Sequence, residues 1–139
     1  VTGSIQVSKA IVTGGGLHAI SFGADFSGSL NVQRATLTAA TGGNGVHLDT
    51  LTAASIIVNG GSVSGDSAIK VGGIANAASS VKLLGVTASG GVDHGVWAAG
   101  AFSGTLTIAG GSVTTANSAV YFGVAHSDNL SVFSRYFKL

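Results

Sequence analysis

Pairs of apolar residues that flank a single intervening residue recur along the whole chain at a nearly constant interval. The first members of successive pairs are spaced by 25, 26, 25, 25 and 24 residues. The pairs are Ile5 and Val7, Leu30 and Val32, Ile56 and Val58, Val81 and Leu83, Leu106 and Ile108, and Leu130 and Val132. Because side chains alternate between the two faces of a β-strand, each pair predicts a short strand with one apolar face.

Each copy of this repeat carries two further apolar signals. Five positions after each pair stands another apolar or small residue, in turn Val12, Leu37, Val63, Ala88, Val113 and Phe137. A second alternating pair follows in the first five copies: Ile20 and Phe22, Val46 and Leu48, Ile69 and Val71, Val96 and Ala98, and Val120 and Phe122. The sequence therefore predicts five full copies and a partial sixth, each with three short strands separated by glycine-rich turns.

The repeat decides the fold class. A unit of about 25 residues cannot bury its apolar face alone, whereas stacked units bury a continuous core and pair every strand. Helices are disfavoured, because the apolar period is two and glycines and β-branched residues are dense. We predict an all-β chain that forms one parallel β-helix, or β-solenoid, over residues 1–139 as a single domain.

Two segments carry the pattern most clearly. Residues 57–69 read IVNGGSVSGDSAI and residues 106–114 read LTIAGGSVT. The pattern resembles the right-handed parallel β-helix of autotransporter passenger domains and related bacterial surface adhesins. The resemblance spans the whole chain and implies a right-handed coil, an extracellular or cell-surface location and a structural or adhesive role. Because the chain begins at Val1 without a basic leader, we expect it to be a mature or excised segment.

Composition narrows the candidate functions. Charged residues make up 8% of the chain, hydrophobic residues 45%, and the mean hydropathy is +0.54, which excludes intrinsic disorder. The net charge of +1 gives no basis for nucleic-acid binding, and no apolar run is long enough to predict membrane insertion. Lys9 and Arg34 occupy equivalent positions in neighbouring copies, a basic spot too small for a nucleic-acid footprint. No cysteine is present, and we expect no cofactor and no metal site.

One outward row of side chains is a candidate contact surface. The residue between the apolar pair of the third strand is Ser21, His47, Lys70, Trp97 and Tyr121 in successive copies. We expect Trp97 to lie near Tyr121, with Lys70 on its other side. Exposed aromatic rings bind sugars or a partner subunit, so Lys70, Trp97 and Tyr121 form a candidate carbohydrate platform. The alternative is a patch that only stabilises the sheet.

A second outward surface carries hydroxyl groups beside the second strand. The flanking residues are Ile11 and Thr13, Thr36 and Thr38, Ser62 and Ser64, Thr87 and Ser89, and Ser112 and Thr114. They predict a flat grid that resembles the Thr-x-Thr face of solenoid antifreeze proteins. Ile11 interrupts this grid, and Ser alternates with Thr. The alternative to ice binding is a soluble β-surface on a chain that is poor in charge.

Acid–base chemistry has few candidate residues. Asp66, Asp93 and His94 fall in the same turn of adjacent copies and form the best cluster for a polysaccharide-cleaving β-helix. Asp also favours turns through side-chain hydrogen bonds to the backbone, so solvated turn residues are the competing interpretation. We predict no catalytic residues and a chain that is not an enzyme.

The ends of the repeat array predict self-assembly. A solenoid needs its terminal copies covered, and both ends here carry apolar side chains. The predicted assembly interface comprises Val1, Ile5, Val7, Leu130, Val132, Phe133, Tyr136, Phe137 and Leu139. End-to-end stacking of this kind does not close on itself and generates a filament. The sequence thus favours a self-assembling adhesive or structural protein, with a carbohydrate-binding or carbohydrate-cleaving β-helix as the alternative.

Overall fold

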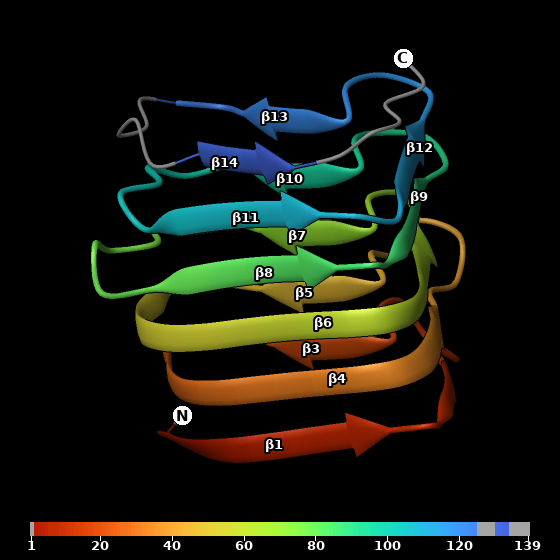
Figure 1. Ribbon diagram of the computed structural model, residues 1–139, viewed down its shortest axis with the longest axis horizontal. Helices are drawn as coiled ribbons and strands as arrows, with labels where there is room; N and C mark the ends of the chain where they lie inside the picture. Colours follow the sequence, from red (N-terminus) through yellow and green to blue (C-terminus); the bar gives the residue numbers. More distant parts are fainter. Residues whose placement is uncertain (1, 125–129, 134–139) are drawn as a thin grey trace.

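The chain forms a parallel β-solenoid of about five turns, each called a rung below. The computed structural model describes residues 2–124 and 130–133. The path coils in the right-handed sense, with one layer of strands in front and a second layer of short strands behind (Figure 1). No helix occurs among the described residues. The predicted all-β solenoid and its interval of about 25 residues are confirmed.

The strands follow one another rung by rung. The first rung holds β1 (Thr2–Ser8), β2 (Ile11–Thr13) and β3 (Ile20–Phe22), the second β4 (Phe26–Thr38) and β5 (Val46–Leu48), and the third β6 (Leu51–Gly65) and β7 (Ile69–Val71). The fourth holds β8 (Ser80–Leu84), β9 (Thr87–Gly90) and β10 (Val96–Ala98), and the fifth β11 (Thr105–Ala109), β12 (Ser112–Thr115) and β13 (Val120–Phe122). Strand β14 (Leu130–Phe133) opens a sixth.

All strand pairs are parallel, and the repeat sets their register. The larger sheet runs β1-β4-β6-β8-β11-β14, with β2, β9 and β12 attached beside it. In it Ile5 pairs with Leu30, and the same column continues through Ile56, Val81, Leu106 and Leu130. The smaller sheet runs β13-β10-β7-β5-β3 and aligns the predicted third strands. The apolar repeat therefore gave the correct inter-rung pairing.

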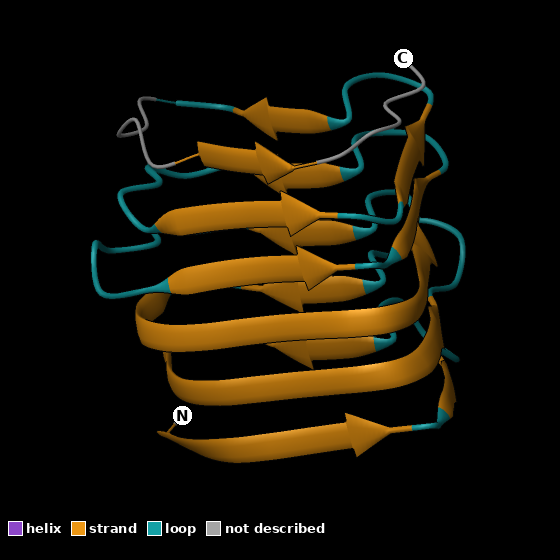
Figure 2. Cartoon of the chain, viewed as in Figure 1, coloured by secondary structure: helices purple, strands orange, loops and turns teal. Residues whose placement is uncertain are grey.

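One expected boundary differs from the structure. We predicted separate first and second strands in every rung, yet in the second and third rungs they form single strands, β4 and β6 (Figure 2). Register between these two strands is maintained around the corner, where Ala35 pairs with Gly61. Continuous pairing on both sides of the bend keeps the ladder intact, so the strand is not interrupted there.

The interior of the solenoid contains the predicted columns and one that the repeat did not reveal. Leu30, Leu37, Leu48 and their equivalents in the middle rungs are fully buried. An additional column of Phe26, Leu51, Ala75 and Phe102 is also buried, at the corner that leads from the smaller sheet into the larger one. It adds a fourth buried column to the three that the first, second and third strand positions contribute.

The predicted assembly residues divide into three groups. Ile5 is 38% exposed and Val7 is half-buried. Leu130, Val132 and Phe133 pair through β14 with β11, as the sixth partial rung requires. Val1, Tyr136, Phe137 and Leu139 lie outside the described residues.

Candidate functional site

The outward side chains of the smaller sheet form the column that the sequence predicted. Ser21 pairs with His47, His47 with Lys70, Lys70 with Trp97 and Trp97 with Tyr121. The Lys70 ammonium nitrogen lies 3.8 Å from the centroid of the Trp97 ring, which confirms the expected neighbour on that side. A contact of this kind at a partly exposed position contributes about 0.5–1 kcal/mol.

Two histidines from turns join this column, which the sequence did not indicate. The ring stacked on Tyr121 is His94, at 4.3 Å between centroids and 12° between planes. His94 also makes an edge contact with Trp97 at 5.5 Å and 72°. In the first two rungs His18 stacks on His47 at 4.4 Å and 8°. We call the set His18, His47, Lys70, Trp97, His94 and Tyr121 the ring ridge.

The ring ridge uses its ring faces for contacts between rungs. Lys70 covers one face of Trp97, and His94 covers one face of Tyr121. The indole nitrogen of Trp97 is buried without a hydrogen-bond partner among the described residues, while Tyr121 remains 42% exposed. Sugars stack on exposed ring faces, so this arrangement favours a ladder that stabilises the sheet over a carbohydrate platform.

A ladder of polar side chains runs beside the ring ridge, two positions before the first residue of each third strand. In four successive pairs the side chain of one rung accepts the backbone N–H of the next. Asn44 N–H donates to His18 Nδ1 at 2.9 Å, Ser67 N–H to Asn44 Oδ1 at 3.2 Å, His94 N–H to Ser67 Oγ at 3.5 Å, and Ser118 N–H to His94 Nδ1 at 3.4 Å. We call His18, Asn44, Ser67, His94 and Ser118 the cap ladder.

The cap ladder satisfies backbone groups that the strands leave unpaired. Ser67 is fully buried and Asn44 is 6% exposed, so their N–H groups lie away from water. A buried N–H without an acceptor is unfavourable, which explains why each rung supplies a polar side chain here. The signal in the sequence was a His, Asn or Ser directly before the small residue that precedes each third strand.

Burial and nearby positive charge favour the neutral form of the His18 and His47 imidazoles in the ring ridge. Burial and then the positive charge of Lys70 lower the pKa of His18 below its ordinary value of 6.5. Burial, followed by the charges of His18 and Lys70, lowers the pKa of His47, against a smaller opposing effect of Asp49. Neutral His18 also keeps Nδ1 free to accept the Asn44 N–H.

We expect the fold to lose stability in mild acid for this reason. Below about pH 6.5 the unfolded chain binds protons on these imidazoles before the folded chain does, so the free energy of unfolding falls as the pH falls. Urea unfolding at about pH 8 and about pH 5 measures the difference. His18→Asn should reduce the pH dependence, because an amide oxygen serves as the acceptor one rung further on at Asn44. Equal wild-type stability at the two pH values would refute this explanation.

The acidic cluster lies where the sequence placed it, in the turns of adjacent rungs. One carboxylate oxygen of Asp66 accepts the Gly42 N–H at 3.3 Å, and the Asp66 carbonyl accepts the Asp93 N–H at 2.9 Å. The Asp93 carbonyl accepts the Thr115 hydroxyl at 3.0 Å. These hydrogen bonds connect the turns of neighbouring rungs. Among the described residues no group of three His, Cys, Asp or Glu side chains is arranged to hold a metal ion.

The hydroxyl grid has the expected register, and a separate hydroxyl column lies near the beginning of the first strands. Thr36 pairs with Ser62 and Thr38 with Ser64, while Ile11 interrupts the first rung at 83% exposure. On β1, β4, β6, β8 and β11 a further column contains Ser4, Ser29, Ser55, Ser80 and Thr105. Ser29 Oγ donates to Ser4 Oγ at 2.9 Å. Hydroxyls bonded to one another in this way reinforce pairing between rungs.

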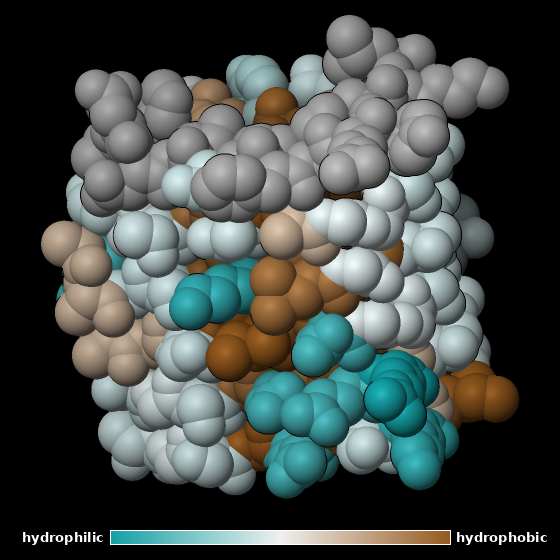
Figure 3. Space-filling view, in the orientation of Figure 1, coloured by the Kyte–Doolittle hydropathy of each residue, from teal (hydrophilic) through white to brown (hydrophobic). Residues whose placement is uncertain are grey.

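A polar pocket lies at the corner where the first three rungs bend from the front layer of strands toward the hydroxyl grid. It has a volume of about 300 Å³ and is lined by Ser8, Lys9, Gln33, Arg34, Asn59 and Gly60. In the space-filling view the most hydrophilic surface lies at the lower right, over the ends of β1 and β4 (Figure 3). Lys9 and Arg34, which sequence analysis treated as an isolated basic spot, are therefore part of a concave surface.

Comparison with protein-family models, curated proteins and solved structures finds no match to the chain. Within residues 2–124 and 130–133, no helix has the length and apolar composition needed to cross a bilayer. The features available for functional inference are the solenoid fold, the exposed edge of β1, the ring ridge and the corner pocket.

Proposed function

We propose that this chain is a structural and adhesive β-solenoid of the cell surface, of the autotransporter-passenger or surface-adhesin type. In this proposal, further β-rungs stack on the end of the solenoid at β1. The observation that carries the proposal is the edge of β1. Among the described residues this seven-residue strand pairs only with β4, and its other edge is open. Open strand edges of this length pair readily with another strand.

The side chains of the first rung support stacking. Ile5 is 38% exposed, whereas its column neighbours Leu30 and Ile56 are fully buried. A rung placed against β1 would bury Ile5 and continue the ladder in the same register. Apolar burial stabilises by about 25 cal/mol per Å². Association would therefore stabilise the first rung by giving it the inter-rung contacts that the inner rungs already have.

The polar surface is consistent with a scaffold role. The cap ladder, the hydroxyl columns and the Asp66 contacts each join one rung to the next along the axis. Side chains used in this way hold a regular rod together and leave its outer faces for contact with other surfaces. We therefore assign the ring ridge to sheet stabilisation, with Tyr121 as its most exposed ring.

Sedimentation velocity at increasing protein concentration tests the stacking. The wild-type chain should associate, and Ile5→Lys should weaken association by about tenfold or more, because a charge at an open edge opposes strand pairing. Thr36→Lys is the matched control, since Thr36 is exposed on the outer grid of the second rung. Circular dichroism confirms that each variant is folded. A wild-type chain that stays monomeric at all concentrations, or an Ile5→Lys variant that associates normally, would overturn the proposal.

A further inference from the structure

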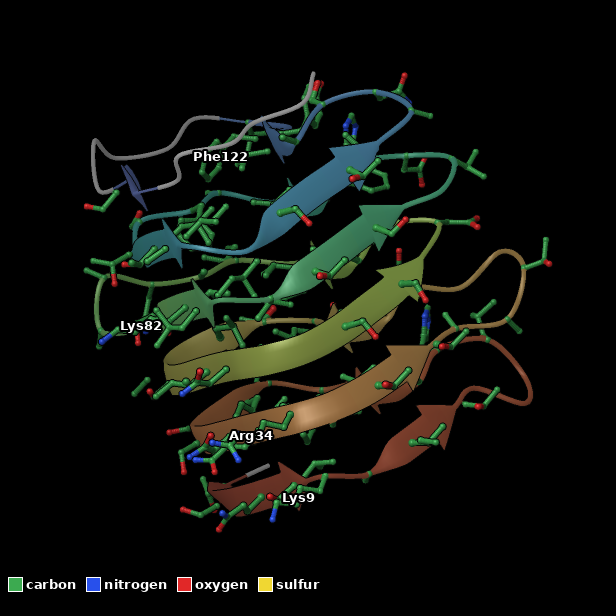
Figure 4. All side chains as sticks on the ribbon, turned by 45° about the vertical axis from the view of Figure 1, so that its right-hand side comes forward. Lys9, Arg34, Lys82 and Phe122 are labelled. Atoms are coloured by element: carbon green, nitrogen blue, oxygen red, sulfur yellow. The ribbon has the colours of Figure 1, made fainter. Side chains whose placement is uncertain are left out.

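The corner pocket holds two cations in neighbouring rungs. Lys9 follows β1 and Arg34 lies within β4, two residues after the paired Val7 and Val32. Figure 4 shows Lys9 and Arg34 one above the other on these rungs, with Lys82 further along the axis. Adjacent rungs are about 4.8 Å apart, so the two charged side chains start from positions close enough to contact one small ligand.

Lysine and arginine are unusual residues for the backbone conformation at this corner. Lys9 and Arg34 both have φ of 50°, in the left-handed region that side chains with a Cβ disfavour. The equivalent residues of the next three rungs are Gly60, Gly85 and Gly110, with φ of 66°, 62° and 66°. The same corner is therefore built from glycine in three rungs and from a strained basic residue in two. Strain retained at a pocket points to a role beyond folding.

The remaining lining residues complement the charges. Gln33 and Asn59 offer amide donors and acceptors, and Ser8 offers a hydroxyl. Within the part of the chain that the structure describes, no carboxylate lines the pocket. A guanidinium binds a carboxylate through two parallel hydrogen bonds, and an ammonium adds a further charge-assisted bond. Amides and hydroxyls in the same depression are suited to the hydroxyl groups of a sugar ring.

We propose that the corner pocket binds an acidic sugar residue, with the sugar carboxylate held by Lys9 and Arg34 and the ring hydroxyls by Gln33, Asn59 and Ser8. The volume of about 300 Å³ is of the size of small-ligand pockets and accommodates a single pyranose ring. Two cations neutralise one anionic group and do not form the extended basic track that a nucleic-acid backbone requires.

The glycine corner gives a bound sugar room to continue as a polymer. Gly60, Gly85 and Gly110 extend the same corner along the axis without side chains, and the last two are exposed. Because Gly60 already lines the pocket, a polysaccharide attached by one acidic ring has room to run past the two further rungs of Gly85 and Gly110. This site does not depend on the stacking of rungs at β1, because its lining residues all belong to the isolated chain.

NMR titration of the isolated chain with D-glucuronate tests the proposal. Glucuronate should bind saturably, D-glucose should bind at least about tenfold more weakly, and inorganic sulfate should also bind more weakly because it lacks the ring hydroxyls. Absence of glucuronate binding, or sulfate binding as tight as glucuronate binding, would overturn the assignment.

Variants at the corner separate binding from folding. The double variant Lys9→Gly/Arg34→Gly adopts the residue that three other rungs already have there, so it should remain folded. Its affinity for glucuronate should fall by about tenfold or more. Lys82→Ala is the control, since Lys82 is a cation on β8 outside the pocket lining, and its affinity should be unchanged. A folded double variant that binds as the wild type does would refute the site.

Discussion

Replacing Ile56 with alanine should lower the free energy of unfolding by about 2–5 kcal/mol, the cost of removing a large aliphatic side chain from a packed core. Ile56 is fully buried in the middle of the solenoid, with Leu30 and Val81 as its column neighbours. The column neighbours are held by their own strand pairing and cannot readily fill the cavity. Urea denaturation followed by circular dichroism measures the change.

Ile5→Ala is the matched control for this prediction. Ile5 occupies the same column in the first rung but is 38% exposed. Its truncation should cost less than about 1 kcal/mol when measured at low protein concentration, because part of the side chain already faces water. Equal losses for Ile5→Ala and Ile56→Ala would show that the two positions are equally buried in solution and would contradict the difference between an end rung and an inner rung.

Most of the fold could be predicted because the repeat encodes it directly. Each rung places the same side-chain pattern on the same strands, so aligning Ile5, Leu30 and Ile56 in sequence also aligned them in space. The additional core column at Phe26 and Phe102 escaped detection for a physical reason. It follows the loops of variable length, and its members range from Phe to Ala, so no constant spacing or residue type marks it.

The candidate site was only partly predictable. The third-strand register placed Lys70 beside Trp97 correctly, because alternation along a strand fixes which side chains point outward. His94 could not be placed in this way, since its ring comes from a turn and folds over the strand to reach Tyr121. Predicting the corner pocket required knowing that Lys9 and Arg34 have left-handed backbone conformations. In the sequence only the glycines at the equivalent positions suggested this.

The cap ladder shows how one backbone requirement can be met by different residues. His18, Asn44 and Ser67 share no side-chain chemistry except an acceptor atom at the right distance from the backbone. Self-similarity of sequence therefore misses the ladder, although it recurs in each rung. Its energetic importance depends on burial, which is greatest at Asn44 and Ser67.

Asn44→Ala should lower the free energy of unfolding by about 1–3 kcal/mol, because it leaves a buried donor without an acceptor. The Asn44 side chain accepts the N–H of Ser67, which is fully buried, while the Asn44 N–H to His18 is retained in the variant. Hydrogen exchange of the Ser67 amide should accelerate at the same time. Asn117→Ala is the control: its exposed amide donates to the Val92 carbonyl at 3.0 Å, and water can replace that bond at a cost of about 0.5 kcal/mol or less. If both variants lose equally little and Ser67 exchange is unchanged, water satisfies the Ser67 N–H and the cap ladder does not stabilise the stack.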